Sequence, residues 1–263
     1  MLRSLYTAAT GMEAQTLNID VIANNLANAN TVGYKKGKAN FQELLYQNVT
    51  TAGAASSDNY LVPTGIQVGL GVKPIAVQKV FQQGDFVQTG NTLDVVIQGD
   101  GFFQVTMPDG TTSYTRDGSF KLDNTGQIVT SDGYPLEPSI TIPITTLTTT
   151  VGSDGKVSVT EAGTTTATQI GQIQIARFIN PGGLNAIGSN LFTPSGSSGD
   201  PVTGNPGTEA FGTLQQGYTE MSNVNVVEEM VNMISSQRAY EMSAKVVTAS
   251  DEMLQDANNM KSS

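Results

Sequence analysis

The sequence contains no cysteine, no histidine and no tryptophan among its 263 residues. Without cysteine the chain can form neither a disulfide nor a thiolate nucleophile. Without histidine it lacks the base of a serine triad and the usual nitrogen ligand of zinc. We therefore predict no catalytic residues, no cofactor-binding residues and no metal ligands, and we expect that the chain is not an enzyme.

Charged residues are also scarce, at 14% of the chain, against about a quarter in a typical soluble domain. The formal net charge is −10, from 23 acidic and 13 basic residues. An acidic chain without a basic tract is a poor ligand for nucleic acid, because that affinity depends on cations that meet phosphates. The sequence has no apolar run long enough for a membrane-spanning helix, and its start does not have the pattern of a secretory signal peptide.

Proline, the strongest helix breaker, is absent from both ends, because all ten prolines lie between Pro63 and Pro206. Apolar residues recur in each end with the three- and four-residue spacing that is typical of a coiled-coil seam. We predict a helix at each end and a self-assembly seam formed by Leu5, Met12, Ile19, Leu26, Met230, Met233, Tyr240 and Val247. Through this seam the helices would pair with each other or with neighbouring copies; the alternative is that each helix packs on its own domain.

Polar residues predict where these helices end. Ser222 or Asn223 is the expected N-cap of the C-terminal helix. Lys35, Lys36 and Lys38 form the only basic cluster. Three cations beyond the end of the N-terminal helix would complement its dipole and need no external partner.

The middle of the chain has the pattern of short antiparallel strands. Val95–Ile97 and Phe102–Val105 are apolar runs, and Asp-Gly or Asn-containing turn signals follow at regular intervals. Ser153–Lys156 matches the S-x-x-K pattern of some serine hydrolases, but the Asp-Gly inside it favours a hairpin turn. We expect carboxylate pairs such as Asp94 and Asp100 to belong to a solvated acidic surface rather than to an acid–base site.

Together these patterns predict an α+β chain, in which N- and C-terminal helices pair as a coiled coil around a central, mainly antiparallel β domain. The predicted divisions are a terminal helical domain (1–32 and 222–263), a connecting segment (33–80) and a β-rich outer domain (81–221).

Two long motifs at opposite ends resemble the signatures of the bacterial flagellar rod and hook family. They are the run Ala23–Lys35 and the run Ser222–Glu241. The signature residues are Asn24, Asn25, Leu26, Ala27, Asn28, Asn30, Thr31, Gly33, Tyr34, Gln237, Arg238, Ala239 and Tyr240. The segment Leu45–Val72 resembles an insertion of the members that form the distal rod, which hook members lack.

This resemblance implies a structural subunit that self-assembles into the hollow distal rod of the flagellar basal body, the drive shaft between motor and hook. Its implied partners are further copies of itself, proximal rod proteins, the hook protein, the periplasmic and outer-membrane ring proteins and the rod cap. The implied location is the rod that spans the periplasm, reached by type III export without a cleavable signal peptide. No nucleic acid and no direct membrane insertion are implied.

Two alternatives stay open at this point. The chain could be a proximal rod or hook paralogue, which has the same architecture at another position. It could also be a peptidoglycan-acting enzyme at the rod, because the absence of histidine does not exclude carboxylate catalysis.

Overall fold

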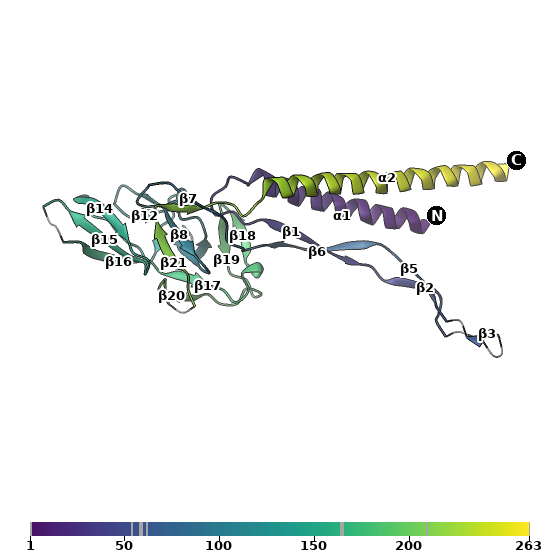
Figure 1. The fold of residues 1–263 in the computed structure, drawn as a ribbon, viewed down its shortest axis with the longest axis horizontal. Coiled ribbons are helices and arrows are strands. Elements are labelled where there is room, and N and C mark those ends of the chain that lie inside the picture. Colours follow the sequence, from purple (N-terminus) through teal and green to yellow (C-terminus); the bar gives the residue numbers. More distant parts are fainter. Residues whose placement is uncertain are drawn as a thin grey trace. The chain divides into compact units, whose positions relative to one another are not determined.

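The computed structural model describes residues 2–53, 55–57, 60–61, 63–163, 166–208 and 210–262. Long helices lie at both ends, α1 (Leu2–Ala27) and α2 (Val226–Ser262), and the strands lie between them in the sequence (Figure 1). Each strand pairing with a described register is antiparallel. The predicted α+β class, with helices at both ends and antiparallel strands between them, is confirmed.

The chain folds as two compact units. The helical unit comprises the described residues of 1–26, 37–78 and 226–263. The β-rich unit comprises the described residues of 27–36 and 79–225. Residues 27–36 thus belong with the strands, and most of the segment between 33 and 80 belongs with the helices. The three-part division expected from the sequence stays a prediction.

A narrow two-stranded ribbon accompanies the helices in the helical unit. Its strands are β1 (Gly37–Glu43), β2 (Tyr46–Thr50), β3 (Ala55–Ser57), β4 (Tyr60–Leu61), β5 (Ile66–Gly69) and β6 (Val72–Lys79). They pair as β1 with β6, β2 with β5 and β3 with β4. The ribbon contains the segment 45–72, which is the expected insertion. Residues 54, 58, 59 and 62 of this segment lie outside the described residues.

The ribbon also approaches α1. Gly71 lies so near α1 that a Cβ atom on it would come within 2.3 Å of Thr10 Oγ1. A larger residue would therefore push the start of β6 away from the helix.

The β-rich unit contains the remaining strands and one short 3₁₀ helix. The strands are β7 (Phe86–Gln88), β8 (Val95–Gln98), β9 (Phe102–Thr106), β10 (Thr112–Thr115), β11 (Lys121–Leu122), β12 (Ile128–Val129), β13 (Leu136–Glu137), β14 (Thr146–Val151), β15 (Lys156–Glu161), β16 (Thr168–Gln172), β17 (Ile175–Arg177), β18 (Asn185–Gly188), β19 (Leu191–Thr193), β20 (Val202–Gly204), β21 (Thr213–Gln216) and β22 (Tyr218–Glu220). The largest sheet has the order β18-β19-β10-β9-β17-β20, and β13 also pairs with β9. The 3₁₀ helix covers Pro181–Gly183.

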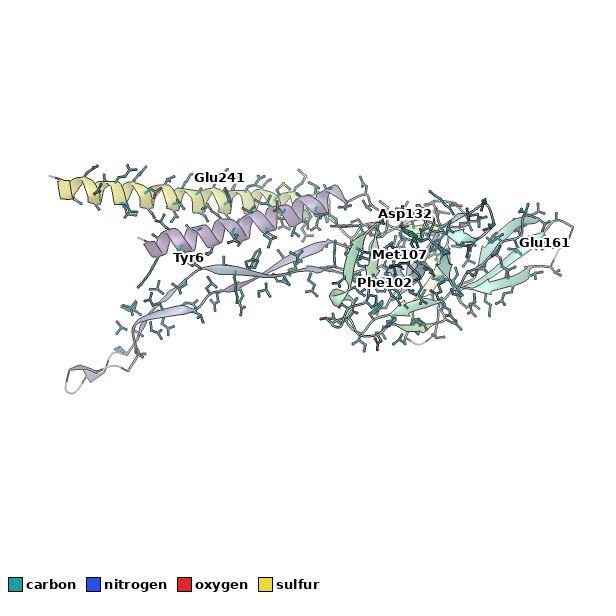
Figure 2. The ribbon with its side chains drawn as sticks, turned by 180° about the vertical axis from the view of Figure 1, so that it is seen from behind. Tyr6, Phe102, Met107, Asp132, Glu161 and Glu241 are labelled. Carbon is teal, nitrogen blue, oxygen red and sulfur yellow. The ribbon has the colours of Figure 1, made fainter. Side chains whose placement is uncertain are left out.

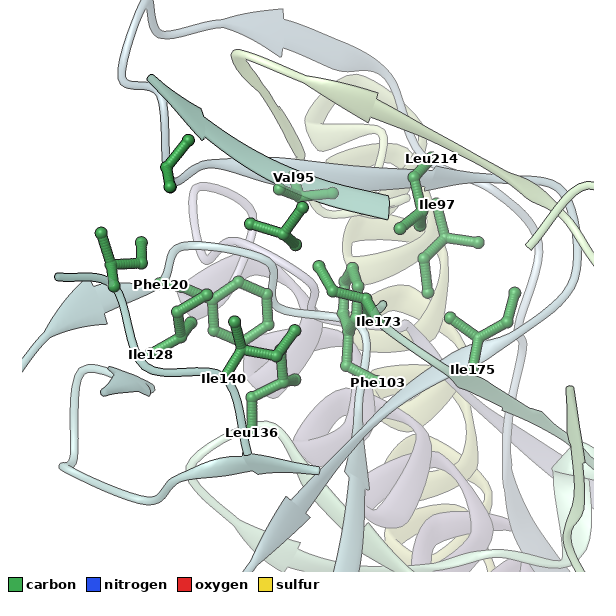
Figure 3. Packing of buried hydrophobic residues seen from close by; sticks show 13 residues of the cluster. Val95, Ile97, Phe103, Phe120, Ile128, Leu136, Ile140, Ile173, Ile175 and Leu214 are labelled. Atoms are coloured by element: carbon green, nitrogen blue, oxygen red, sulfur yellow. The ribbon is translucent and has the colours of Figure 1, made fainter. Parts of the chain in front are cut away.

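Two hydrophobic cores lie on opposite faces of this sheet, because successive side chains of a strand point to opposite sides. Phe103 of β9 and Ile175 of β17 belong to the larger core, which also holds Phe120 and Leu136 (Figure 3). Their neighbours Phe102 and Ala176 belong to the smaller core, formed by Phe102, Tyr114, Ala176, Phe178, Leu184 and Phe192. Edge-to-face ring pairs such as Tyr114–Phe178, with centroids 4.8 Å apart, stabilise the smaller core.

Of two local predictions for the β-rich unit, one is confirmed and the other is wrong for one residue. Ser153–Lys156 forms the hairpin turn between β14 and β15, as predicted. The solvated acidic surface is wrong for Asp94, which is buried and accepts hydrogen bonds from Thr89 Oγ1 and Asn91 Nδ2. These two neighbours satisfy the hydrogen-bonding needs of the buried carboxylate. A count of acidic residues along the sequence does not reveal such partners.

The predicted N-cap of the C-terminal helix is also wrong, because α2 begins only at Val226. Asn223 instead accepts a hydrogen bond from Lys36 N and donates to the carbonyl oxygens of Val80 and Gln82. The side chain thus joins three segments of the β-rich unit rather than capping a helix.

Candidate functional site

A line of small and polar residues joins α1 to α2 within the helical unit. Three hydrogen bonds connect Ser4 Oγ with Ser250 Oγ (3.3 Å), Asn18 Nδ2 with Ser236 Oγ (2.8 Å) and Asn25 Nδ2 with Glu229 Oε2 (3.2 Å). Between the first two, a Cβ atom on Gly11 would lie 3.5 Å from Ser243 Oγ. We call the set Ser4, Gly11, Asn18, Asn25, Glu229, Ser236, Ser243 and Ser250 the polar line.

The spacing of the polar line is regular. Each contact lies seven residues further along α1 and seven residues further back along α2. The two helices therefore run antiparallel in one constant register, side by side (Figure 1). A repeat of seven keeps one stripe of a helix against its partner over the whole length. Asn25, Glu229, Ser236 and Ser250 are buried.

The eight residues of the predicted self-assembly seam lie beside this line. Each α1 member directly follows a polar-line residue, and all four are half-buried. On α2, Met233 and Val247 are half-buried, whereas Met230 is 50% and Tyr240 is 40% exposed. That these residues form the seam between copies stays a prediction.

Exposed apolar side chains are concentrated in the helical unit. Of the 26 large hydrophobic residues that are exposed in the described part of the chain, nineteen lie there, although this unit has fewer residues than the other. On α1 and α2 they are Tyr6, Val226, Val227, Met230, Val231, Ile234, Tyr240, Met242, Val246, Met253, Leu254 and Met260. Figure 2 shows how densely side chains project from both helices, with Tyr6 and Glu241 labelled. A large apolar surface on a folded chain marks an interaction surface.

A buried ion pair in the β-rich unit joins the segment that follows α1 to the segment that precedes α2. Lys35 Nζ binds Glu220 Oε1, with side-chain exposures of 0% and 1%, and also donates to the carbonyl oxygen of Gln82 (2.9 Å). Gly84 N donates to the same carboxylate oxygen (2.9 Å). The expectation that Lys35 only complements a helix dipole is wrong, because α1 ends at Ala27 and this ammonium group has a dedicated carboxylate.

Arg116 adds a second buried cation to this cluster. Its Nη1 lies 3.9 Å from Glu220 Oε2, and its Nη2 donates to the carbonyl oxygen of Gly99 (2.8 Å). Burial lowers the pKa of Lys35, against the opposing effect of Glu220, and burial likewise lowers the pKa of Arg116. Glu220 is therefore the carboxylate that both buried cations share.

The family-signature residues separate into buried and exposed groups. Asn25, Gly33 and Tyr34 are buried. Leu26, Asn28, Thr31 and Ala239 are half-buried, and the exposed members are Asn24, Ala27, Asn30, Gln237, Arg238 and Tyr240. Lys79 Nζ lies 4.2 Å from the centre of the Tyr34 ring, a cation–π contact.

Sequence reasoning missed Glu220, Glu229 and Asn223 as contact residues. Glu220 carries no local pattern in the sequence. A signal was present in Glu229, Ser236, Ser243 and Ser250, which repeat every seven residues beside the apolar positions.

Three family models match the chain. "Flagella basal body rod protein" matches residues 5–35, "Flagellar hook protein FlgE/F/G D1 domain" matches 96–159, and "Flagellar basal body rod FlgEFG protein C-terminal" matches 215–260. The flagellar basal-body rod protein FlgG of Borreliella burgdorferi is 50% identical, over 99% of both chains. This chain belongs to the flagellar basal-body rod protein family.

Other flagellar relatives match with the same full coverage. The flagellar basal-body rod protein FlgG of Caulobacter vibrioides is 48% identical, over 99% of this chain and all of the relative. The flagellar hook-basal body complex protein FlhP of Bacillus subtilis is 29% identical, over 99% of this chain and all of the relative. The family is one of structural rod proteins.

The two terminal matches of this rod-family chain meet in the structure. Asn25 and Lys35 lie in the N-terminal match, and their partners Glu229 and Glu220 lie in the C-terminal match. Among the described residues, no helix is long and apolar enough to cross a membrane, and no cluster of three or more acidic side chains could hold a metal ion.

Proposed function

We propose that this chain is a structural subunit that self-assembles into the distal rod of the bacterial flagellar basal body. Full-length similarity to proteins named FlgG supports the rod assignment. Open, head-to-tail association of identical subunits gives a helical filament, because such an interface does not close into a ring. The filament would act as the drive shaft between motor and hook.

The observation that carries this proposal is the apolar surface of the helical unit. Val231 and Ile234 of α2 are 60% and 49% exposed. Each side chain of this size that a neighbour covers contributes roughly 1.5–3 kcal/mol. We therefore expect further copies of the chain to cover this surface of the helix pair, rather than the chain to remain a monomer.

The helix pair itself is the proposed building block of the tube. The seven-residue spacing of the polar line supports a coiled coil of α1 with α2 within one subunit. The predicted seam, which includes Leu5, Met12 and Met230, would then face neighbouring copies and line the inside of the assembly. Its half-exposed apolar side chains support that role.

The remaining assignments follow from the proposed position in the rod. The proposed partners are proximal rod proteins, the hook protein, the ring proteins of the periplasm and outer membrane, and the rod cap. We infer export through the flagellar type III channel without a cleavable signal peptide, and a role without catalysis. Detection of the chain in the distal segment of purified basal bodies, by labelled antibody, would separate this assignment from a proximal rod or hook position.

Sedimentation of the full chain over a concentration series tests self-assembly directly. The variant Val231→Ser/Ile234→Ser should remain monomeric at concentrations where the wild type forms large particles, because it removes exposed apolar groups of α2. The matched control is Leu122→Ser/Ile144→Ser, which changes exposed apolar residues of the β-rich unit. Equal assembly by the wild type and the α2 variant would refute the proposal for this surface.

A further inference from the structure

The polar line by itself does not define which residues of α1 and α2 meet. Its members are mostly small hydroxyl and amide side chains repeated every seven residues. A shift of one repeat, about 10 Å along the helix axis, would place Ser4 against Ser243 and Asn18 against Glu229. Both of these pairs can hydrogen bond, so the pattern tolerates more than one register.

Asn25 differs from the other members of the line because its amide is also bound to a residue outside both helices. Its Oδ1 accepts from Gly37 N (2.8 Å), and its Nδ2 donates to Gly37 O (2.9 Å) in strand β1. The same Nδ2 donates to Glu229 Oε2 (3.2 Å). Asn25 is 2% exposed and Glu229 is 5% exposed. One amide therefore connects α1, α2 and the ribbon.

Glu229 lies at the edge of a polar cavity between the helices. A cavity of about 420 Å³ is lined by polar groups that include Gln15, Asn18, Asn25, Glu229 and Ser236. A buried carboxylate is costly unless a donor satisfies it. If Asn25 no longer donated, Asn18, one repeat away on the same face of α1, would be the nearest equivalent amide in the line.

We propose that Asn25 is the residue that determines the register of the helix pair, by holding Glu229 of α2 while its amide is fixed to Gly37 of the ribbon. Polar residues at coiled-coil positions commonly specify register in this way. The consequence for assembly rests on the proposed function: only one register would present the exposed apolar residues of both helices in a single arrangement to neighbouring copies.

The absence of cysteine allows a clean test by disulfide trapping in the full chain under monomeric conditions. The variant Ser4→Cys/Ser250→Cys should cross-link within the chain on mild oxidation, whereas Ser4→Cys/Ser243→Cys should cross-link only after a shift of one repeat. Adding Asn25→Ala should raise the rate of the second cross-link relative to the first by about tenfold or more, because a hydrogen bond to a buried charge is lost.

Asn18→Ala is the matched control, because it removes an amide of the polar line that is not bound to β1. It should leave the 4–250 cross-link dominant. Glu229→Ala removes the same contact from the α2 side, but it also removes the partner that Asn18 would gain in the shifted register. It should therefore raise the 4–243 cross-link less than Asn25→Ala does. Helical circular dichroism equal to the wild type confirms that each variant is folded. If the 4–250 cross-link stays as dominant in Asn25→Ala as in Asn18→Ala, the proposal is wrong, whether or not the chain assembles into a rod.

Discussion

Lys35 and Glu220 form an ion pair without solvent exposure, although 185 positions separate them in the sequence. Lys35 lies in the segment that follows α1, and Glu220 lies in the segment that precedes α2. A backbone hydrogen bond joins the same two segments, because Gly33 N donates to Glu220 O (2.8 Å). Within the β-rich unit, a side-chain ion pair and a backbone hydrogen bond therefore join the segment that follows α1 to the segment that precedes α2.

Breaking this pair should be strongly destabilising. Glu220→Gln leaves the Lys35 ammonium buried without a carboxylate, which is expected to lower the free energy of unfolding by about 3–5 kcal/mol. Lys35→Met should have a similar effect, because the buried carboxylate of Glu220 then keeps only the hydrogen bond from Gly84 N and the guanidinium of Arg116, 3.9 Å away. Urea unfolding of the monomeric chain measures both changes.

The double variant Lys35→Met/Glu220→Gln distinguishes a buried pair from two independent contacts. It should recover part of the loss, since neither charge of the pair is then left alone, while Arg116 still lacks this carboxylate. Lys156→Met is the control, because Lys156 pairs with Asp154 at 2.7 Å on the surface, where an ion pair adds little. Additive losses in the double variant would contradict the coupling.

Gly33 should resist substitution for two separate reasons. Its φ of +70° is unfavourable for any residue with a Cβ atom, and such an atom would lie 2.7 Å from Asp117 N. We expect Gly33→Ala to lower the free energy of unfolding by about 2 kcal/mol or more. Gly90→Ala is the matched control, with a φ of +72° and no atom within 4 Å of the added carbon. Equal losses in the two variants would show that the close approach to Asp117 contributes nothing.

Two aspartates with the same local geometry should respond oppositely to pH. Asp117 Oδ1 accepts from Ser119 N (2.9 Å) and Oγ (2.6 Å), and Asp109 Oδ1 accepts from Thr111 N (2.9 Å) and Oγ1 (2.6 Å). Burial raises the pKa of Asp117 above 3.8, whereas in exposed Asp109 the hydrogen bond from the Thr111 hydroxyl lowers the pKa below 3.8.

The sign of each effect follows from proton linkage. Asp117 contributes stability below pH 3.8 that is lost as pH rises through its raised folded pKa. Asp109 contributes stability above pH 3.8 that is lost as pH falls through its lowered folded pKa. Between about pH 3 and pH 7, the stability of Asp117→Asn relative to wild type should therefore rise, and that of Asp109→Asn should fall. Parallel changes in urea titrations of the two variants would contradict this assignment.

The sequence predicted the elements whose signal is periodic. Proline-free ends with apolar residues at heptad spacing predict α1 and α2, and the apolar run Phe102–Val105 predicts β9. It did not predict Lys35–Glu220 or Asn25–Gly37, because these contacts depend on how distant segments meet in three dimensions. A lysine near a helix end has the same local pattern whether it is solvated or buried. The apolar heptads also do not indicate the small polar residues beside them, although these polar residues make hydrogen bonds between α1 and α2.

The outer part of the ribbon should stiffen the assembly rather than stabilise the subunit. Among the described strands, β2 and β5 pair only with each other. Leu45, Val49 and Ile66, which lie on these strands or beside them, are exposed. A two-stranded ribbon is marginally stable alone, so neighbouring copies are expected to cover it. Deleting 46–69 removes both strands together and leaves the hydrogen bond from Leu44 N to Gly71 O (2.8 Å) at the new connection. The shortened chain should assemble into more flexible filaments, with unchanged unfolding of the β-rich unit.

Electron microscopy of filament curvature measures this stiffness, and urea unfolding checks the β-rich unit. The matched control, Tyr46→Ser/Val49→Ser/Ile66→Ser, keeps the length of the ribbon but removes exposed apolar groups. If packing against neighbours provides the stiffness, this variant should be nearly as flexible as the deletion, because each lost side chain removes an interface contact. If it is as stiff as wild type while the deletion is flexible, the backbone of the ribbon is responsible. Equal stiffness of wild-type and deleted filaments would contradict any role of the ribbon in transmitting torque.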